Sequence, residues 1–186
     1  MIRRARLTQA SGILAFFSGV VILIAGATNL SHLPDVEHSE ANFANIRGQM
    51  SGKSVMIPGA PVIGSCANLE LLNSSVTYAP QECDDRAAYK VVQIVPHANE
   101  CIADVDGKFS SSGGQWVARL DFNWRAGTCI EVVDGRGQVE SCDRRGADIH
   151  EPVSVSTGTA SYDNCAYHGF SHPVRKFVIC TRPTQL

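Results

Sequence analysis

Seven cysteines constrain what this 186-residue chain can fold into more than any other feature. All of them lie after residue 65, at Cys66, Cys83, Cys101, Cys129, Cys142, Cys165 and Cys180. No Cys-x-x-Cys pair occurs, which excludes the spacing of a thioredoxin-like redox motif or a zinc ribbon. In an exported chain, cysteines of this number indicate disulfides. Because seven is odd, one thiol must be free or bonded to another molecule.

The first thirty residues indicate export. Three arginines precede an apolar run of about 18 residues, Ala10 to Ala27, which is close to the length that crosses a bilayer. With the arginines inside, the rest of the chain lies outside. We therefore predict a membrane anchor at residues 1–30, single-pass, with a cytoplasmic N-terminus and an extracytoplasmic C-terminal domain. A cleaved signal peptide is the alternative, because Ala25-Gly26-Ala27 offers a small-x-small cleavage site and cleavage would release a secreted domain.

Charge limits the expected partners. Without the three arginines of the anchor, 13 of the 16 basic residues remain against 18 acidic residues, a net charge of −5. We therefore expect no nucleic acid partner. Residues 31–61 have few aromatic residues and scattered acidic residues, serines and glycines, and we predict that they form a tether. Residues 62–186 then form the extracytoplasmic domain.

Short cysteine-containing segments of this domain recur about 60 residues further along the chain. The matching pairs are Gly64-Ser65-Cys66 with Gly127-Thr128-Cys129, Cys83-Asp84 with Cys142-Asp143, and Asn99-Glu100-Cys101 with Asp163-Asn164-Cys165. We read the domain as two tandem pseudo-repeats, at about 62–124 and 125–186. Each repeat is predicted to contain a disulfide-closed hairpin, a strand, a short helix and a closing strand. The predicted fold class is therefore α+β and strand-rich, after an N-terminal transmembrane helix.

The closing strands of the two repeats indicate which cysteine is unpaired. From Trp116 to Trp124, large apolar side chains alternate with other residues, as is typical of a half-buried strand. When Trp116 is aligned with Phe177, Arg119 falls on Cys180. If the repeats share one bonding scheme, Cys101 has lost its partner and is a free thiol.

Hairpin geometry predicts the disulfides. A two-residue loop that begins with glycine suits a primed turn, and a loop at Gly135-Arg136 places Cys129 opposite Cys142, within disulfide distance. The three predicted bonds are Cys129–Cys142 from this geometry, Cys66–Cys83 from the repeat, and Cys165–Cys180 from the two cysteines that then remain.

Several motifs are shared with a known family. They are Gly-x-Cys at 64–66, Glu-Cys at 82–83, Asn-Glu-Cys-x-x-Asp at 99–104, Leu-Asp-Phe-Asn-Trp-x-x-Gly-Thr-Cys at 120–129, Cys-Asp at 142–143 and Phe-Val-Ile-Cys at 177–180. In these segments the chain resembles the LppU family of actinobacterial envelope (lipo)proteins, related to septum-formation-like exported modules. The resemblance implies a cell-envelope location and eight domain cysteines, one of which Arg119 replaces here. The family has no established activity, so none is implied.

Few patterns point to chemistry. The chain has no Gly-x-Ser-x-Gly, His-Glu-x-x-His, phosphate-binding or dinucleotide-binding motif, so we predict no catalytic residues and no cofactor. Cys165, His168 and His172 would suit a metal only if Cys165 were reduced, and the predicted disulfide therefore argues against a metal site. Three acidic residues can approach one another, although turn and strand-end acids are commoner than catalytic pairs: Asp104, Asp106 and Asp121.

We expect a membrane-tethered extracytoplasmic binding or accessory module of the cell envelope, without catalysis. Its expected partner is another envelope or membrane protein. Three readings of Cys101 stay open: a buried inert thiol, a covalent dimer or link to a partner, and a reactive thiolate favoured by Arg119. The last would make the protein a thiol-dependent redox protein or enzyme. A small-ligand carrier, with its cavity between the two repeats, is a further alternative.

Overall fold

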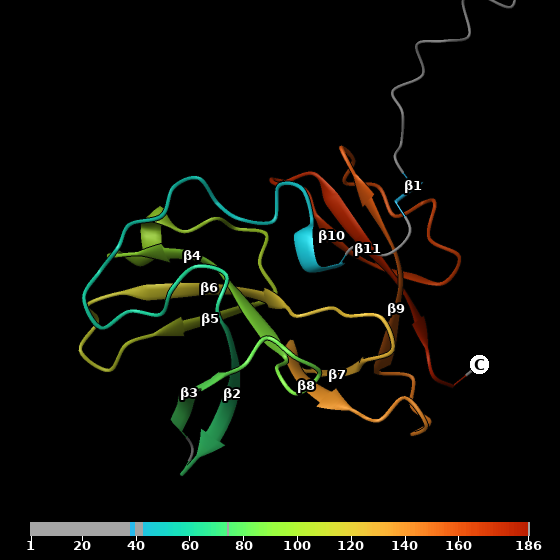
Figure 1. Cartoon of the computed structure of the whole chain (residues 1–186), viewed down its shortest axis with the longest axis horizontal. Helices are drawn as coiled ribbons and strands as arrows, with labels where there is room; N and C mark the ends of the chain where they lie inside the picture. Colours follow the sequence, from blue (N-terminus) through green and yellow to red (C-terminus); the bar gives the residue numbers. More distant parts are fainter. Residues whose placement is uncertain (1–37, 40–42, 74, 186) are drawn as a thin grey trace, which may run out of the picture. The chain divides into compact units, whose positions relative to one another are not determined.

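The computed structural model describes residues 38–39, 43–73 and 75–185. These residues form two antiparallel sheets (Figure 1). The predicted anchor at residues 1–30 lies outside the described residues. Within the described part of the chain, no helix is long and apolar enough to cross a membrane.

Each sheet is built from one half of the domain. The first contains β2 (Cys66–Leu72), β3 (Ser75–Gln81), β4 (Tyr89–Val95), β5 (Gly107–Ser110) and β6 (Val117–Phe122). The second contains β7 (Cys129–Val133), β8 (Arg136–Glu140), β9 (Ile149–Thr157), β10 (His168–His172) and β11 (Phe177–Pro183), together with β1 (His38–Ser39), which pairs with β9.

The two sheets have the same topology. The spatial order is β3-β2-β4-β6-β5 in the first and β8-β7-β9-β11-β10 in the second, so each strand occupies the same place as the strand five positions later. In each sheet the first hairpin joins its neighbour through only two register pairs, while the other strands form longer ladders. This shared order supports the internal repeat that the cysteine-containing segments indicate.

The predicted fold class, α+β with a short helix in each repeat, is wrong. Both halves consist of antiparallel strands, and the described residues contain only two single-turn 3₁₀ helices, Phe43–Asn45 and Ala98–Glu100. The second of these stands where a helix was expected in the first repeat. The corresponding segment of the second repeat, residues 162–167, forms a turn and a bend that lead into β10. Segments this short lack the length to offset the cost of nucleating an α-helix.

Strand register confirms the alignment of the closing strands. In the first sheet Phe109 faces Ala118, and in the second Phe170 faces Ile179. The next position along is Arg119 in β6 and Cys180 in β11. The half-buried pattern predicted for 116–124 is incomplete, because the alternate residues of β6 are also largely covered. Asp121 and Asn123 are buried on the second face of this central strand.

The register predicted for the β7–β8 hairpin is wrong. The loop residues are Asp134 and Gly135, with φ angles of 51° and 72°, rather than Gly135 and Arg136. Two positive φ angles are the signature of a type I′ turn, which Asp-Gly favours. As a result Cys129 faces Glu140, and Cys142 lies beyond the end of β8.

The structure contains the three disulfides that the sequence predicts. Cys66–Cys83, Cys129–Cys142 and Cys165–Cys180 have Cα–Cα distances of 5.0, 5.2 and 5.1 Å. The Cys129–Cys142 bond therefore forms although the two residues are not register partners. The described residues include all seven cysteines, and Cys101 is the one among them that is free.

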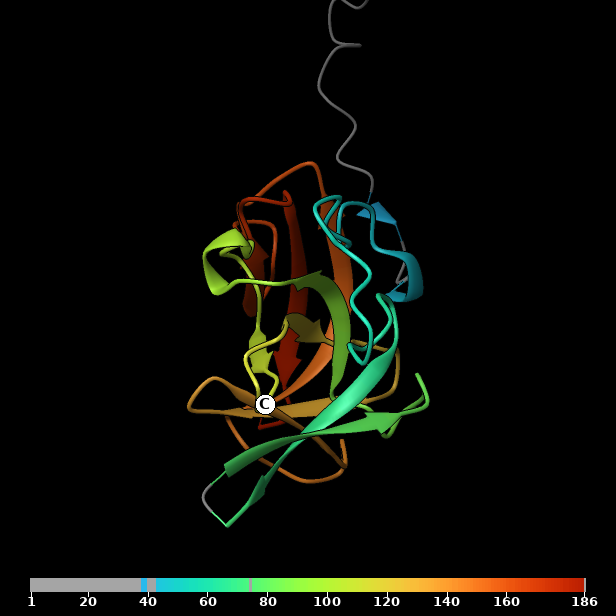
Figure 2. The ribbon, with the colours of Figure 1, turned by 90° about the vertical axis from the view of Figure 1, so that its left-hand side faces the viewer.

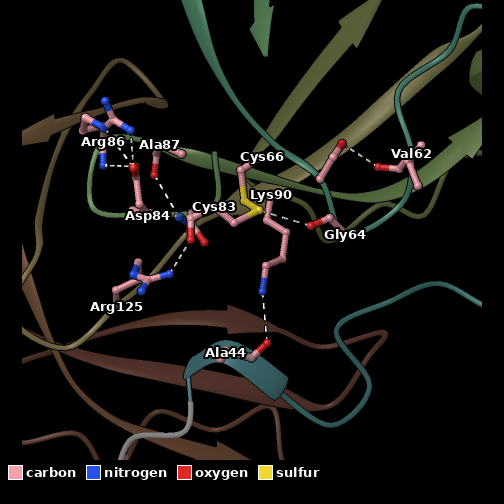
Figure 3. Close-up of a disulfide and its surroundings, with 12 residues drawn as sticks. Ala44, Val62, Gly64, Cys66, Cys83, Asp84, Arg86, Ala87, Lys90 and Arg125 are labelled. Atoms are coloured by element: carbon pink, nitrogen blue, oxygen red, sulfur yellow. Dashed lines mark hydrogen bonds and ion pairs between the residues drawn. A yellow bond between two sulfur atoms is a disulfide. The ribbon is translucent and has the colours of Figure 1, made fainter. Parts of the chain in front are cut away.

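The prediction that residues 31–61 form a tether is wrong for the residues of this range that the structure describes. Phe43 and Ile46 belong to the core, and the segment that follows donates backbone hydrogen bonds from Ser51 to Val92 and from Val55 to Ile94. Lys90 of β4 also donates to the Ala44 carbonyl oxygen, as Figure 3 shows beside the Cys66–Cys83 disulfide. Residues 43–61 are therefore part of the domain. The few apolar residues of this segment recur with the spacing of neither a strand nor a helix. The sequence pattern therefore favoured a tether.

One hydrophobic core is shared by both repeats. Its buried side chains come from both sheets and from the N-terminal segment, and include Phe43, Tyr89, Leu120, Phe122, Trp124, Ile130, Val155, Phe177 and Ile179. Phe122 and Trp124 of the first repeat pack against Phe170 of the second. The repeats therefore fold as one body.

Candidate functional site

A groove of about 1260 Å³ lies between the first repeat and the β7–β8 hairpin. Its walls come from β2, the start of β4, residues 103–110 and β8. The β2–β3 hairpin is attached to its sheet only at Cys66 and Ala67, and beyond that point it projects from the body (Figure 2). The projecting hairpin and β8 are what leave the groove open between them.

Tyr89 forms the floor of the groove. Its side chain is 1 % exposed, and its hydroxyl oxygen accepts a 2.6 Å hydrogen bond from the Gly137 backbone N–H of β8. A Cβ at Gly137 would lie 2.3 Å from the Phe122 ring, and one at Gly107 would lie 2.9 Å from the Tyr89 ring. Both positions therefore require glycine for this close approach. Burial raises the pKa of Tyr89, so the hydroxyl stays protonated and neutral.

The lining of the groove is amphipathic. Leu71 and Val76 on the projecting hairpin and Val133 on β7 are exposed apolar side chains. Four basic and four acidic residues share the same lining: Arg86, Lys108, Arg119 and Arg136 with Glu70, Asp106, Glu131 and Asp134. A surface of this kind offers both apolar contact and balanced hydrogen bonding, without a bias toward a strongly charged ligand.

Behind the groove, a buried arginine connects the two repeats. Arg175, in the turn between β10 and β11, binds both oxygens of Asp121 on β6, at 2.7 and 2.9 Å. Its Nε also donates to Asp104 at 3.0 Å, and its Nη1 donates to the Gln49 carbonyl oxygen at 2.8 Å. Asp104 additionally accepts the backbone N–H groups of Val174 and Arg175. Two of the three acidic residues noted in the sequence, Asp104 and Asp121, are thus brought together around one cation from the other repeat.

Asp106 lies between this cluster and the groove. Its Oδ2 accepts a 2.9 Å hydrogen bond from the Phe122 backbone N–H and lies 3.8 Å from the Nε2 of His172. Burial raises the pKa of Asp106 to about 7, an effect that His172 and Arg175 oppose. Ligand atoms of Asp106, Asp121 and His172 lie within 4.8 Å of one another.

The Cys165, His168 and His172 set is not assembled. Cys165 is oxidised, and His168 and His172 lie at opposite ends of β10, facing Thr181 and Phe177 on β11. His168 packs beside His150 and Phe170 instead, with ring centroids 5.1 and 5.0 Å away. A sequence spacing of four on a strand separates these side chains along its length.

Cys101 is partly buried and does not belong to the groove lining. The side chain of Gln93 is hydrogen-bonded to the backbone of the residues on either side of Cys101. Gln93 is fully buried on β4 and is the register partner of Arg119 on β6. The Gln93 amide accepts a hydrogen bond from the Ile102 N–H at 2.8 Å and donates to the Glu100 carbonyl oxygen at 3.3 Å. In the second repeat the Cys165–Cys180 disulfide fastens the equivalent segment. Gln93 therefore fastens the loop that lacks a disulfide.

Sequence reasoning missed Arg175 and the partnership of His172 with Asp106. Arg175 lies in a turn without a recognisable motif, and its partners are 54 and 71 residues away in the chain. The one available signal for a buried cation was the group of Asp104, Asp106 and Asp121, because acidic side chains that lie close together in a folded protein need a cation nearby. The groove gave no local signal, because its walls come from hairpins of both repeats.

Comparison of the chain with family models, with curated proteins and with solved structures found no match.

Proposed function

We propose that this domain is an extracytoplasmic recognition module that binds an extended segment of another envelope protein in the groove between its repeats. The groove itself is the observation that supports this function. It combines apolar side chains, a rigid floor at Tyr89, and equal numbers of basic and acidic side chains. A polypeptide segment supplies the matching mixture of apolar and polar groups.

Two strand edges provide backbone hydrogen-bonding groups for such a segment. β5 is the last strand of the first sheet and β8 is the last strand of the second, and residues of both line the groove. An edge strand presents unpaired N–H and C=O groups, to which an extended peptide can add as a further strand. Side chains of the bound segment would then alternate toward the groove floor and away from it.

The disulfides support the proposed extracytoplasmic location. Three disulfides close loops in a domain of fewer than 150 residues, which suits an oxidising compartment. The predicted anchor at residues 1–30, or cleavage there, would deliver the domain to that compartment. Membership of the LppU-like family and attachment to the membrane are parts of this proposal. Both agree with the cysteine framework.

Affinity capture from detergent-solubilised membranes tests the proposal. The bait is the tagged full-length chain, compared with Val133→Glu in the groove and Val153→Glu outside its lining. The two valines are matched in type and exposure, at 50 % and 51 %. We expect a stoichiometric partner to be recovered with the wild type and with Val153→Glu, and to be lost with Val133→Glu.

Two other results would contradict the proposal. Loss of the partner in both variants, or in neither, would show that binding does not use the groove. Recovery of no stoichiometric protein from these membranes would leave the groove without the partner that the proposal requires.

A further inference from the structure

The cluster behind the groove carries more buried negative charge than its arginine offsets. Asp104, Asp106 and Asp121 have side chains that are 3 %, 11 % and 1 % exposed. Arg175 is 5 % exposed and pairs with Asp104 and Asp121, but not with Asp106. Three carboxyl groups share one guanidinium in a place that water barely reaches, and burial keeps Asp106 partly protonated at neutral pH, with a pKa of about 7. A further cation at this place would favour the ionised form of these groups.

His172 lies against this excess with an unpartnered nitrogen. Its side chain is 2 % exposed, and its Nε2 has no hydrogen-bond partner among the described residues. This nitrogen is directed toward Asp106 Oδ2, but the 3.8 Å separation is too long for a hydrogen bond. A buried polar atom without a partner calls for an explanation, and a bound ion is one that satisfies it.

We propose that Asp106, Asp121 and His172 form a binding site for one divalent transition-metal ion of the Zn²⁺ type. Their ligand atoms lie within 4.8 Å of one another. Ligands of one Zn²⁺ stand about 2.0–2.2 Å from the ion, so small rotations of these side chains bring all three into its coordination shell. The positive charge of the ion would offset the carboxylate charge that Arg175 leaves unpaired, and binding would release the proton that Asp106 holds in part at neutral pH.

The surroundings of His172 suit a metal ligand. Its Nδ1 lies 2.8 Å from the Asp104 carbonyl oxygen and 2.8 Å from Arg175 Nη2. Both protons of Arg175 Nη2 go to oxygens, the Asp104 carbonyl and Asp121 Oδ1, so Nδ1 of His172 can carry its own proton and donate it to the same carbonyl oxygen. This tautomer leaves the lone pair on Nε2, the arrangement that a metal ligand requires. The ring is also held by stacking on Phe177, with centroids 4.2 Å apart. The ligand is therefore preoriented.

The donor set selects the class of ion, and the groove gives it access. One imidazole nitrogen with carboxylate oxygens favours Zn²⁺ over Ca²⁺ or Mg²⁺, which prefer oxygen ligands throughout. Asp106 belongs to the groove lining, so an ion reaches the cluster from the groove. This site goes beyond the proposed recognition of a polypeptide, because it binds an ion whether or not a partner is present.

Zinc binding to the purified full-length chain tests the site. The protein is stripped with chelator and titrated with Zn²⁺ in competition with a chromophoric chelator, which leaves only tight binding visible. We expect one Zn²⁺ per chain and affinity lower by roughly 100-fold or more in His172→Gln and in Asp106→Asn, because each variant loses one ligand. His150→Gln is the matched control, a mostly buried histidine of the same sheet outside the cluster, and should bind as the wild type does.

A second measurement keeps the test independent of variants that fail to fold. Co²⁺ added to the stripped wild-type protein should give visible d–d absorption, and Zn²⁺ should abolish it while excess Ca²⁺ or Mg²⁺ should not. Absence of tight Zn²⁺ binding to the wild type would overturn the proposal. Unchanged affinity in folded His172→Gln, an equal loss in His150→Gln, or displacement by Ca²⁺ would overturn it as well.

Discussion

At the scale of single residues, Arg175 has the most far-reaching contacts. It joins Asp121 of the first repeat, the Asp104 loop and Gln49 of the N-terminal segment, all from a turn of the second repeat. Its guanidinium also lies 5.1 Å above the Phe177 ring. Such a buried ionic network adds little net stability compared with an apolar core, but removing one partner leaves the others buried and unpaired.

Replacing Arg175 should therefore destabilise the protein strongly. We expect Arg175→Met to lower the free energy of unfolding by about 3–5 kcal/mol, because Asp104 and Asp121 lose their cation in a buried site. The control is Arg182→Met, whose pair with Glu151 is exposed to solvent and should therefore contribute little to stability. Urea unfolding of both variants measures the difference, and equal losses would contradict the role assigned to Arg175.

A second residue-scale prediction concerns pH. Burial lowers the pKa of His150, nearby His168 lowers it further, and Asp148 opposes both effects. The folded state therefore binds fewer protons than the unfolded state just below the ordinary histidine value of 6.5. The contribution of His150 to stability is present above pH 6.5, and it is lost as pH falls from there toward the lower pKa that His150 has in the folded state.

Urea unfolding at several pH values between 7 and 5 checks this. Between pH 7 and 5, the free energy of unfolding of the wild type should fall relative to that of His150→Gln, while Asp106, with its pKa raised to about 7, acts in the opposite direction in both proteins. His97→Gln, at an exposed position, should follow the wild type. A slope unaffected by His150→Gln would assign the pH dependence to other groups.

Among the secondary-structure elements, the sequence predicts the strands and the cysteine pairs better than it predicts turn type and strand register. The strands, the repeat and the three cysteine pairs are all readable from alternation, turn residues and recurring segments. The hairpin register was wrong because Asp134 and Gly135 both adopt positive φ, and glycine alone does not say on which side of it the loop lies. Neither expected α-helix forms, because both segments are too short: the first is a single 3₁₀ turn hydrogen-bonded to Gln93, and the second is held by the Cys165–Cys180 disulfide.

The equivalence of Arg119 and Cys180 predicts a fourth disulfide. In Arg119→Cys, a new thiol on β6 occupies the place of Cys180, and Cys101 occupies the place of Cys165. We expect the two to form a bond under oxidising conditions. Closing a loop of this size should raise the free energy of unfolding by about 3 kcal/mol.

Mass spectrometry after alkylation without reductant checks the bond. Wild-type protein should carry one alkylated cysteine, Cys101, and Arg119→Cys should carry none. The control Gln115→Cys, an exposed position on the same segment, should carry two. Two alkylated cysteines in folded Arg119→Cys would mean that the first repeat does not share the bonding geometry of the second.

At the scale of the whole molecule, the groove and the charged cluster arise only from the way the repeats pack. Tyr89 receives its hydrogen bond from Gly137 on the other sheet, and Asp106 faces His172 across the same junction. These partners are separated by 48 and 66 residues, so no local pattern in the chain could have indicated them. The repeat itself could be predicted, but its pattern did not indicate how the two copies pack together.

The central claim is that the groove between the repeats is where a partner protein binds. Site-specific photo-crosslinking in intact cells tests it most directly, with a photoreactive residue at position 133 in the groove or at position 153 outside its lining. We expect one discrete adduct from position 133, none from position 153, and loss of the adduct when Leu71→Glu is added on the opposite wall. Equal adducts from both positions, or an adduct from position 153 alone, would contradict it.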